Sequence, residues 1–214
     1  MKPLTKNTAI ALLMGGPGSE RDVSLQSGKA VLEALQQEGF TRVTPVVVDS
    51  ERPEIPEGTE LCYNIIHGTY GEDGGLQTYL EELGLPYTGA GSESSRNCFD
   101  KILSKKAFVA AGVPTPRSEI IRRGQRPTLP LPCVIKPPCE GSSVGVQIVK
   151  EESELAAALE ADSHFGEELL VEEFIKGKEL TVAIFDGEAL PVVHICPAPA
   201  STTSTTNIPP STAA

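Results

Sequence analysis

The first half of the chain alternates short apolar runs with helical segments, and this alternation restricts the fold more than any other feature. Three runs predict buried strands, at residues 8–14 (TAIALLM), 43–49 (VTPVVVD) and 61–68 (LCYNIIHG). Helical segments follow the first and third runs, the latter at residues 74–84 (GGLQTYLEELG). Strand–helix units with short connections form parallel sheets covered by helices. We therefore expect an α/β fold that begins with a parallel sheet.

The first helical segment predicts both its packing face and its end. Val31, Ala34 and Leu35 share one helical face, and Gly39 stands where a C-cap belongs. Ligands of parallel sheets gather at the carboxyl ends of the strands. Residues 15–22 and 67–75 follow two of these ends, so both segments are candidate site loops.

From about Ser94 the pattern changes to an α+β unit with antiparallel strands. Residues 96–112 (RNCFDKILSKKAFVAAG) predict a helix that ends at Gly112. The strand runs LPCVIKP and VGVQIV enclose the loop PCEGSSVG, and a helix (ESELAAALE) and a strand (ELLVEEF) follow. Residues 179–195 (ELTVAIFDGEALPVVHI) predict a hairpin with Asp-Gly at its turn.

Composition excludes several classes of protein. A formal net charge of -11 argues against nucleic-acid or anionic membrane partners. The five cysteines form no CxxC pair, which is typical of reduced thiols in a cytoplasm. The N-terminal apolar run is too short for a signal peptide, and no stretch is long enough to cross a bilayer. The sequence predicts a cytoplasmic protein.

The first glycine-rich loop, GGPGSERD, matches neither a P-loop nor a dinucleotide-binding fingerprint. A tight strand-to-helix turn accounts for its glycines equally well. The functional interpretation depends on Glu20, which stands beside Arg21 at the predicted helix start. A carboxylate in this place could receive the ammonium group of a substrate.

The second glycine-rich loop, IKPPCEGSSVGV, combines a strand lysine with two glycines and two hydroxyls. Its backbone N–H groups, with Ser142 and Ser143, could close over phosphates while Lys136 supplies a fixed positive charge. The alternative is a plain hairpin loop with a surface lysine, because Gly-Ser loops are common.

A cluster of acidic residues lies in LLVEEFIKGKEL. Glu172 and Glu173 end a predicted strand, and Glu179 follows a turn. A solvated acidic edge is the usual structural explanation of such a cluster. The functional interpretation is that one carboxylate binds an adenine amino group and another binds a ribose diol.

The remaining polar candidates are histidines and a lysine. His67 follows a strand end, whereas His164 is predicted on a surface loop and His194 could face inward or outward. Lys101, taken alone, is one of three surface lysines in FDKILSKK.

Five motifs occur in one order and spacing, and together they indicate a family. They are MGGPGSERDVSLQSG, IIHGTYGEDGGLQTYLEELGLPYTGAG, DKILSKKAFVAAGVPTP, VIKPPCEGSSVGV and LVEEFIKGKELTVAI. The chain resembles D-alanine–D-alanine ligases of the ATP-grasp superfamily from about Ala9 to about Pro197. The resemblance implies a Rossmann-like domain at 1–93, a partial ATP-grasp subdomain at 94–197 and a low-complexity tail at 198–214.

The resemblance also implies an activity, its cofactors and its site residues. It implies joining of two D-alanines with ATP and Mg²⁺ through a D-alanyl phosphate, for peptidoglycan precursors. Glu20 would hold the first D-alanine's ammonium, His67 would lie beside its carboxylate, and Ser142 would link Glu20 to a closing loop. The expected nucleotide ligands are Lys101, Lys136 and Ser143 for phosphates, Glu172 for adenine and Glu179 for ribose. A homodimer is implied as well.

The family pattern stops within a few residues of Cys196. The resemblance implies three further features: a lid, an arginine that stabilises the transferring phosphoryl group, and carboxylates that bind magnesium. None of them follows, and the chain reads APASTTSTTNIPPSTAA. Such a segment cannot bury enough apolar surface to order itself. It is either a natural linker or the product of a shifted reading frame, and the abrupt change favours the second. We therefore expect a protein with little or no activity and poor solubility.

Two alternatives stay open from the sequence. A ligase making a D-Ala–D-lactate or D-Ala–D-Ser product would share these motifs, because the selecting lid is not present. A non-catalytic module could also keep the D-alanine pocket and half of a nucleotide site.

Overall fold

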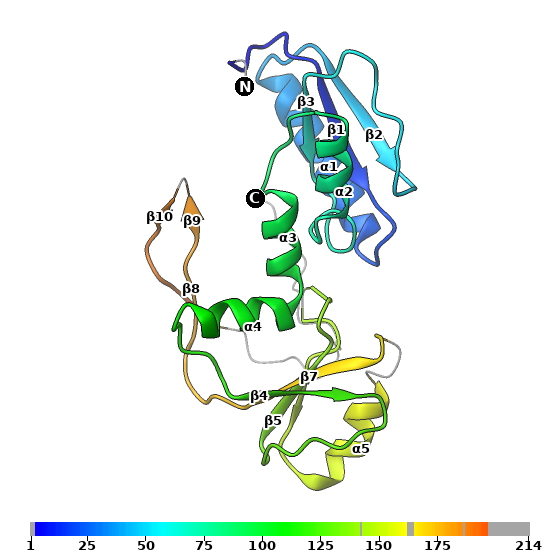
Figure 1. Ribbon diagram of the computed structural model, residues 1–214. Helices are drawn as coiled ribbons and strands as arrows, with labels where there is room; N and C mark the ends of the chain where they lie inside the picture. Colours follow the sequence, from blue (N-terminus) through cyan, green and yellow to red (C-terminus); the bar gives the residue numbers. More distant parts are fainter. Residues whose placement is uncertain (1–2, 142, 162–164, 186, 197–214) are drawn as a thin grey trace. The chain divides into compact units, whose positions relative to one another are not determined.

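The computed structural model describes residues 3–141, 143–161, 165–185 and 187–196 (Figure 1). Ser142, His164, Asp186 of the predicted turn and the tail lie outside the described residues. The chain divides into two compact units, one ending at Phe174 and the other beginning at Ile175.

A three-stranded parallel sheet opens the first unit, as predicted. Its order is β2-β1-β3, with β1 at Ile10–Gly15, β2 at Val43–Val48 and β3 at Leu61–Asn64. Every residue of β1 is buried. A continuous apolar run is what a central strand covered on both faces requires.

Two details of the predicted strands are wrong. In β2 only Val48 is fully buried and Val47 is 48% exposed, because β2 is an edge strand with one neighbour. The third strand ends at Asn64 instead of residue 68. There Asn64 Oδ1 accepts from Ile66 N–H (3.0 Å) and its amide donates to Gly71 (2.8 Å), which turns the chain out of the sheet.

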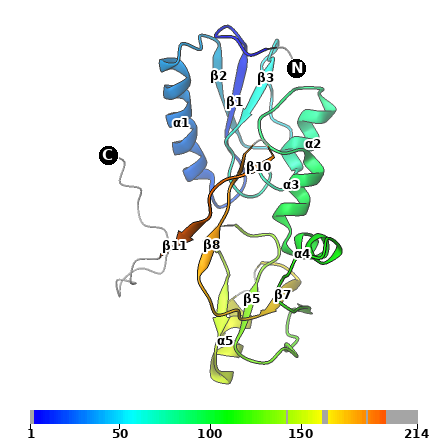
Figure 2. The same ribbon diagram turned by 90° about the vertical axis from the view of Figure 1, so that its left-hand side faces the viewer.

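Helices α1 (Arg21–Gln37) and α2 (Gly75–Glu82) lie on opposite faces of this sheet (Figure 2). Of the predicted α1 face, Val31 and Leu35 are partly buried, on the side that carries the fully buried Ser24 and Gly28, whereas Ala34 is exposed. Ser24 Oγ accepts from Gly15 N–H (2.9 Å) and donates to the Ile65 carbonyl (2.8 Å). Small residues therefore bring α1 close to the sheet.

The opposite face of the sheet and α2 share one hydrophobic core. Leu76 and Leu80 of α2 pack with Ala11, Leu13 and Cys62 of the sheet.

The predicted end of α1 is confirmed, because Gly39 has a φ of +85°.

The helix predicted at 96–112 is broken into two. Helix α3 covers Ser92–Phe99 and α4 covers Lys101–Ala110, with Asp100 in an extended conformation between them. Asp100 Oδ1 accepts from the N–H groups of Ile102 (2.8 Å) and Leu103 (3.3 Å). An N-cap side chain thus competes with helix continuation at this residue.

A four-stranded antiparallel sheet follows, with strand order β4-β7-β5-β6. Its elements are β4 (Ser118–Arg122), β5 (Cys133–Lys136), β6 (Gln147–Val149), α5 (Glu152–Ala161) and β7 (Glu168–Glu173). Leu155 and Ala158 of α5 pack on one face, in a core separate from the first. Helix α4 lies over the other face (Figure 1). The domain boundary at residue 93 stays a prediction.

The described residues of the second unit form the predicted hairpin. Strand β8 (Glu179–Thr181) pairs with β11 (Val193–Ile195), and β9 (Ile184–Phe185) pairs with β10 (Glu188–Ala189). Gly187 at the turn has a φ of +81°. The hairpin exposes several apolar side chains, with Phe185 74% and Ile184 66% accessible.

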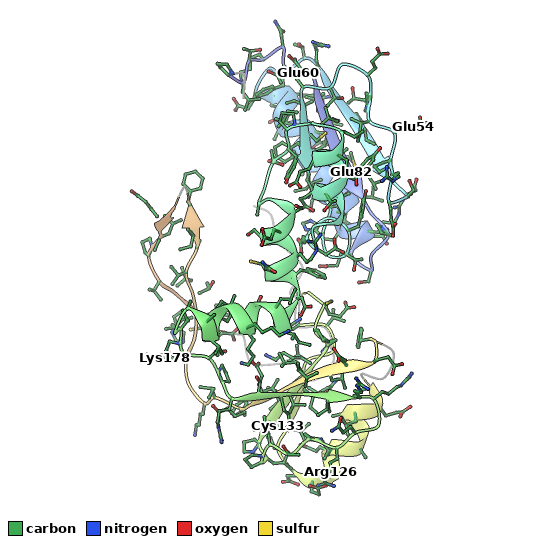
Figure 3. All side chains as sticks on the ribbon, viewed as in Figure 1. Glu54, Glu60, Glu82, Arg126, Cys133 and Lys178 are labelled. Carbon is green, nitrogen blue, oxygen red and sulfur yellow. The ribbon has the colours of Figure 1, made fainter. Side chains whose placement is uncertain are left out.

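The surface of the first unit is rich in acids, and Glu54, Glu60 and Glu82 project from it (Figure 3). Within the described residues, no helix combines the length and the apolar character needed to cross a membrane.

The contact between α1 and β1 gives a stability prediction. A Cβ at Gly28 would lie 2.7 Å from Met14 Sδ and 2.8 Å from Met14 Cβ. We expect Gly28→Ala to lower the free energy of unfolding by about 1–3 kcal/mol through overpacking, measured by urea denaturation. Lys29→Ala, at an exposed neighbouring position, should cause little loss. A gain of about 1 kcal/mol in Gly28→Ala, as helix propensity alone predicts, would contradict the contact.

Candidate functional site

Glu172 lies on the face of the antiparallel sheet that α5 does not cover. Its carboxylate oxygens bind two lysines from different elements: Lys105 of α4 at 2.5 Å from Oε1, and Lys136 of β5 on Oε2. Lys105 also donates to Thr115 Oγ1 (2.8 Å). Only 8% of Lys105 and 9% of Glu172 is exposed. One buried carboxylate therefore connects α4 with the strands β5 and β7.

The ionisation of Glu172 reflects two opposed effects. Burial raises the pKa of its carboxyl, and the hydrogen bonds from Lys105 and Lys136 lower it. The lysines prevail, so the pKa of Glu172 lies below its usual value. The carboxylate is charged at neutral pH in spite of its burial.

Lys101, at the start of α4, reaches the second glycine-rich loop, which lies between β5 and β6 and is called the glycine-rich loop below. Its Nζ donates to the carbonyl of Glu140 at 2.6 Å, and its backbone N–H donates to the carbonyl of Pro138 at 3.0 Å. Burial and the nearby charge of Lys136 lower the pKa of Lys101. The structure thus gathers Lys101, Lys136 and the loop, which the sequence predicted as separate phosphate ligands.

The glycine-rich loop is tightly folded. Val144 N–H donates to the Gly141 carbonyl (2.9 Å), and both Ser143 and Gly145 have positive φ, +63° and +70°. A Cβ at Gly145 would lie 2.7 Å from Pro137 Cγ. Glycine at 145 is therefore required by both space and backbone conformation. Ser143 is exposed, and its role in phosphate binding stays a prediction.

Glu20 precedes the first residue of α1, as predicted, and its carboxylate lies between two glycines. Its Oε2 is 2.7 Å from the position that a Cβ would take on Gly68, and 3.4 Å from that on Gly141. Glu20 comes from the loop after β1, Gly68 from the loop after β3, and Gly141 from the glycine-rich loop between β5 and β6. The structure therefore brings the two predicted strand-end loops together.

His67 adjoins this carboxylate region through Gly68. Its Nε2 lies 3.1 Å from Ser27 Oγ on α1, and its Nδ1 lies 3.8 Å from Glu72. His67 also lines a cavity of about 440 Å³ with Asn64 and Gln77. Its position fits the predicted neighbourhood of a substrate, although its role stays a prediction.

Two other charged residues of the motifs have structural partners. Arg21 donates to the carbonyls of Gly16 and Val48, both at 2.9 Å, and pairs with Asp49, so it holds the first loop in place. Glu173 accepts from Arg117 N–H and Nε, each at 2.9 Å.

Two predicted ligands are not placed in the site by the structure. Glu179 begins β8 in the second unit, and Ser142 lies outside the described residues. Glu172 was predicted to face adenine; in the structure both of its oxygens bind lysines.

Lys105 is the residue that sequence analysis missed, since it was counted among three surface lysines. The available signal was its spacing: Lys101 and Lys105 are four residues apart and share a helix face. Among the described residues no group of three or more histidines, cysteines or carboxylates could hold a metal ion. These residues alone do not fit a protein-bound magnesium site.

Comparisons with known proteins agree on one family. Residues 106–201 match the model for the D-Ala-D-Ala ligase C-terminus. The D-alanine–D-alanine ligase of Methylacidiphilum infernorum is 43% identical over 88% of this chain and 62% of its own length. That of Citrifermentans bemidjiense is 45% identical over 90% and 64%.

Solved structures give the same result. The chain superposes on the Bacillus anthracis D-alanine–D-alanine ligase complexed with ATP with a TM-score of 0.80 and 34% identity, covering 90% of this chain and 65% of that one. The fold is that of solved D-alanine–D-alanine ligases. The chain is similar to D-alanine–D-alanine ligases over about nine tenths of its own length, and it spans a little under two thirds of the length of the curated relatives cited above.

The cap of α4 gives a prediction. We expect Asp100→Ala to lower the free energy of unfolding by about 1 kcal/mol, because two N–H groups lose their acceptor. Asp100→Asn should retain most of the stability, since its amide oxygen can cap. Equal losses in both variants, measured by urea denaturation, would contradict a capping role.

The lowered pKa of Glu172 predicts a pH dependence of folding. Its folded pKa lies below the unfolded one, so its contribution to stability is present at neutral pH and lost as pH falls through the folded pKa. We expect Glu172→Gln to weaken the decline of stability between about pH 5 and pH 3. Urea denaturation across this range provides the measurement, and Glu151→Gln, whose carboxylate is exposed, is the control. An unchanged slope in Glu172→Gln would contradict the prediction.

Proposed function

We propose that this chain carries the first-substrate and phosphate-binding parts of an ATP-dependent ligase that joins two D-alanines. The observation that carries the proposal is that Lys101 bonds the glycine-rich loop, while Lys136, whose charge acts on Lys101, stands at the strand end where this loop begins. Two cations beside a loop with positive-φ residues suit the phosphates of a nucleotide. The similarity to D-alanine–D-alanine ligases supplies the substrate class.

The reaction requires activation of a carboxylate. The carboxylate oxygen of one D-alanine attacks the terminal phosphorus of ATP, forming D-alanyl phosphate and releasing ADP. The amine of a second D-alanine then attacks the acyl carbon, and phosphate leaves. Lys101 and Lys136 hold the phosphates in line with the carboxylate, and this positioning lowers the barrier without covalent catalysis.

The amino-acid end of the site is assigned to Glu20 and His67. The Glu20 carboxylate receives the ammonium of the first D-alanine, and His67, oriented by Ser27, lies beside its carboxylate. Glycines at 68 and 141 leave room around Glu20. Mg²⁺ enters the proposal as a companion of the ATP phosphates, and no step depends on a metal ligand of this chain.

The cellular setting follows from the same family. We propose action in the cytoplasm on D-alanine for peptidoglycan precursors, by a homodimer. D-alanine as the second substrate, rather than D-lactate or D-serine, is part of the proposal. Competition among the three acceptors in an assay of ADP formation would distinguish them.

The phosphate assignment is testable by calorimetry with ADP. We expect the unaltered chain to bind ADP and Lys136→Met to bind it roughly 10- to 100-fold more weakly, because a charged hydrogen bond to phosphate is lost. Lys150→Met, at an exposed position, should bind like the unaltered chain. Equal affinities in all three proteins would refute the role of Lys136, and absence of binding to the unaltered chain would refute the nucleotide site.

The amino-acid assignment is tested with D-alanine. Glu20→Gln should weaken D-alanine binding roughly 10-fold or more, since a charged acceptor of the ammonium becomes neutral. Asp22→Asn, in the first turn of α1, is the matched control for a change of charge. Binding that is insensitive to Glu20→Gln would place the ammonium elsewhere.

A further inference from the structure

We propose that Lys105 is a positioning residue. It keeps the Glu172 carboxylate paired with a positive charge, so that Lys136 can leave this carboxylate and bind a nucleotide phosphate. The inference rests on the proposed function, because it assumes that a nucleotide occupies the glycine-rich loop. It assigns a role to a residue outside the predicted ligand set.

The two lysines on Glu172 differ in how firmly they are held. Lys105 has a second partner in Thr115 at 2.8 Å, and 10% of its side chain is exposed. Lys136 has 22% of its side chain exposed and stands at the end of β5, where the glycine-rich loop begins. Lys136 is therefore the lysine placed to move toward a ligand, and Lys105 the one that stays.

The position of Glu172 makes a permanent partner necessary. A buried carboxylate that loses its only cation is strongly disfavoured and takes up a proton instead. If Lys136 were the sole partner, its transfer to a phosphate would leave Glu172 without compensation. With Lys105 in place, the same transfer leaves one intact ion pair.

Few other groups can act on Glu172. The charged groups that face it are Lys105 from α4 and Lys136 from β5. Its register partners on the neighbouring strands are Ser118 on β4 and Val134 on β5, both uncharged. The next carboxylate along β7, Glu173, pairs with Arg117. A change in the protonation of Glu172 would thus report on the two lysines.

The test is proton uptake on ADP binding, measured by calorimetry at pH 6 in buffers of different ionisation enthalpy. We expect Lys105→Met to take up more protons than the unaltered chain, by a difference approaching about one per ADP. Lys105→Arg should restore the unaltered value, because the cation returns. Lys106→Met, the exposed neighbour on α4, is the matched control and should show no excess.

The source of the proton is identified by a double variant. Lys105→Met combined with Glu172→Gln should lose the excess uptake, since the carboxyl is absent. ADP binding to Lys105→Met without excess uptake would overturn the inference and leave the nucleotide site intact. Excess uptake that persists in the double variant would overturn it as well.

Absence of ADP binding to the unaltered chain would refute the proposed function and the inference with it. A second measurement tests Lys105 as the counter-ion of Glu172 without a nucleotide, and it decides the inference if Lys105→Met does not fold. In Lys136→Met, Lys105 is the remaining partner of Glu172. A ¹³C NMR titration of the Glu172 carboxyl should then show it ionised at pH 5. Protonation of Glu172 at that pH would show that Lys105 is not a sufficient counter-ion and would overturn the inference.

Discussion

The buried carboxylate of Glu172 is the interaction on which the second half of the first unit depends. It fixes helix α4 to the sheet through Lys105, and it holds Lys136 at the end of β5. The start of the same helix, capped by Asp100, carries Lys101 to the glycine-rich loop. Electrostatics and packing are therefore inseparable here: the cations that a phosphate would meet are positioned by the helix and sheet that the ion pairs connect.

The other half of the site depends on close packing. Gly28 and Ser24 bring α1 onto the sheet, and this sets the position of Glu20 at the helix start. Its carboxylate then meets loops from two other parts of the chain. The arrangement agrees with the general tendency of parallel sheets to collect ligands at strand ends.

The sequence predicted those features whose cause is local. The apolar run at residues 8–14 predicted a strand of a parallel sheet, and this strand is β1. Gly39 and Gly112 were predicted to end helices, and both have positive φ in the structure. The break at Asp100 was missed, because good helix formers such as Lys101 and Leu103 follow it and the competing hydrogen bonds come from one side chain.

The role of Lys105 could not be read from its neighbours either, since its partner lies 67 residues further along the chain. Burial of a lysine is a tertiary property, and a surface helix pattern does not reveal it. The exposed apolar side chains of the hairpin illustrate the same limit, because strand periodicity alone does not say which side chains another layer covers.

The two glycines around Glu20 have a consequence for how such a sequence can change. Gly68 and Gly141 are far apart along the chain, yet each abuts the same carboxylate. A side chain at Gly68 would force the Glu20 carboxylate to move, whereas a Cβ at Gly141 would only touch it. Across descendants of this sequence, a change at Gly68 should therefore be accompanied by a change at Glu20, while Gly141 can change alone.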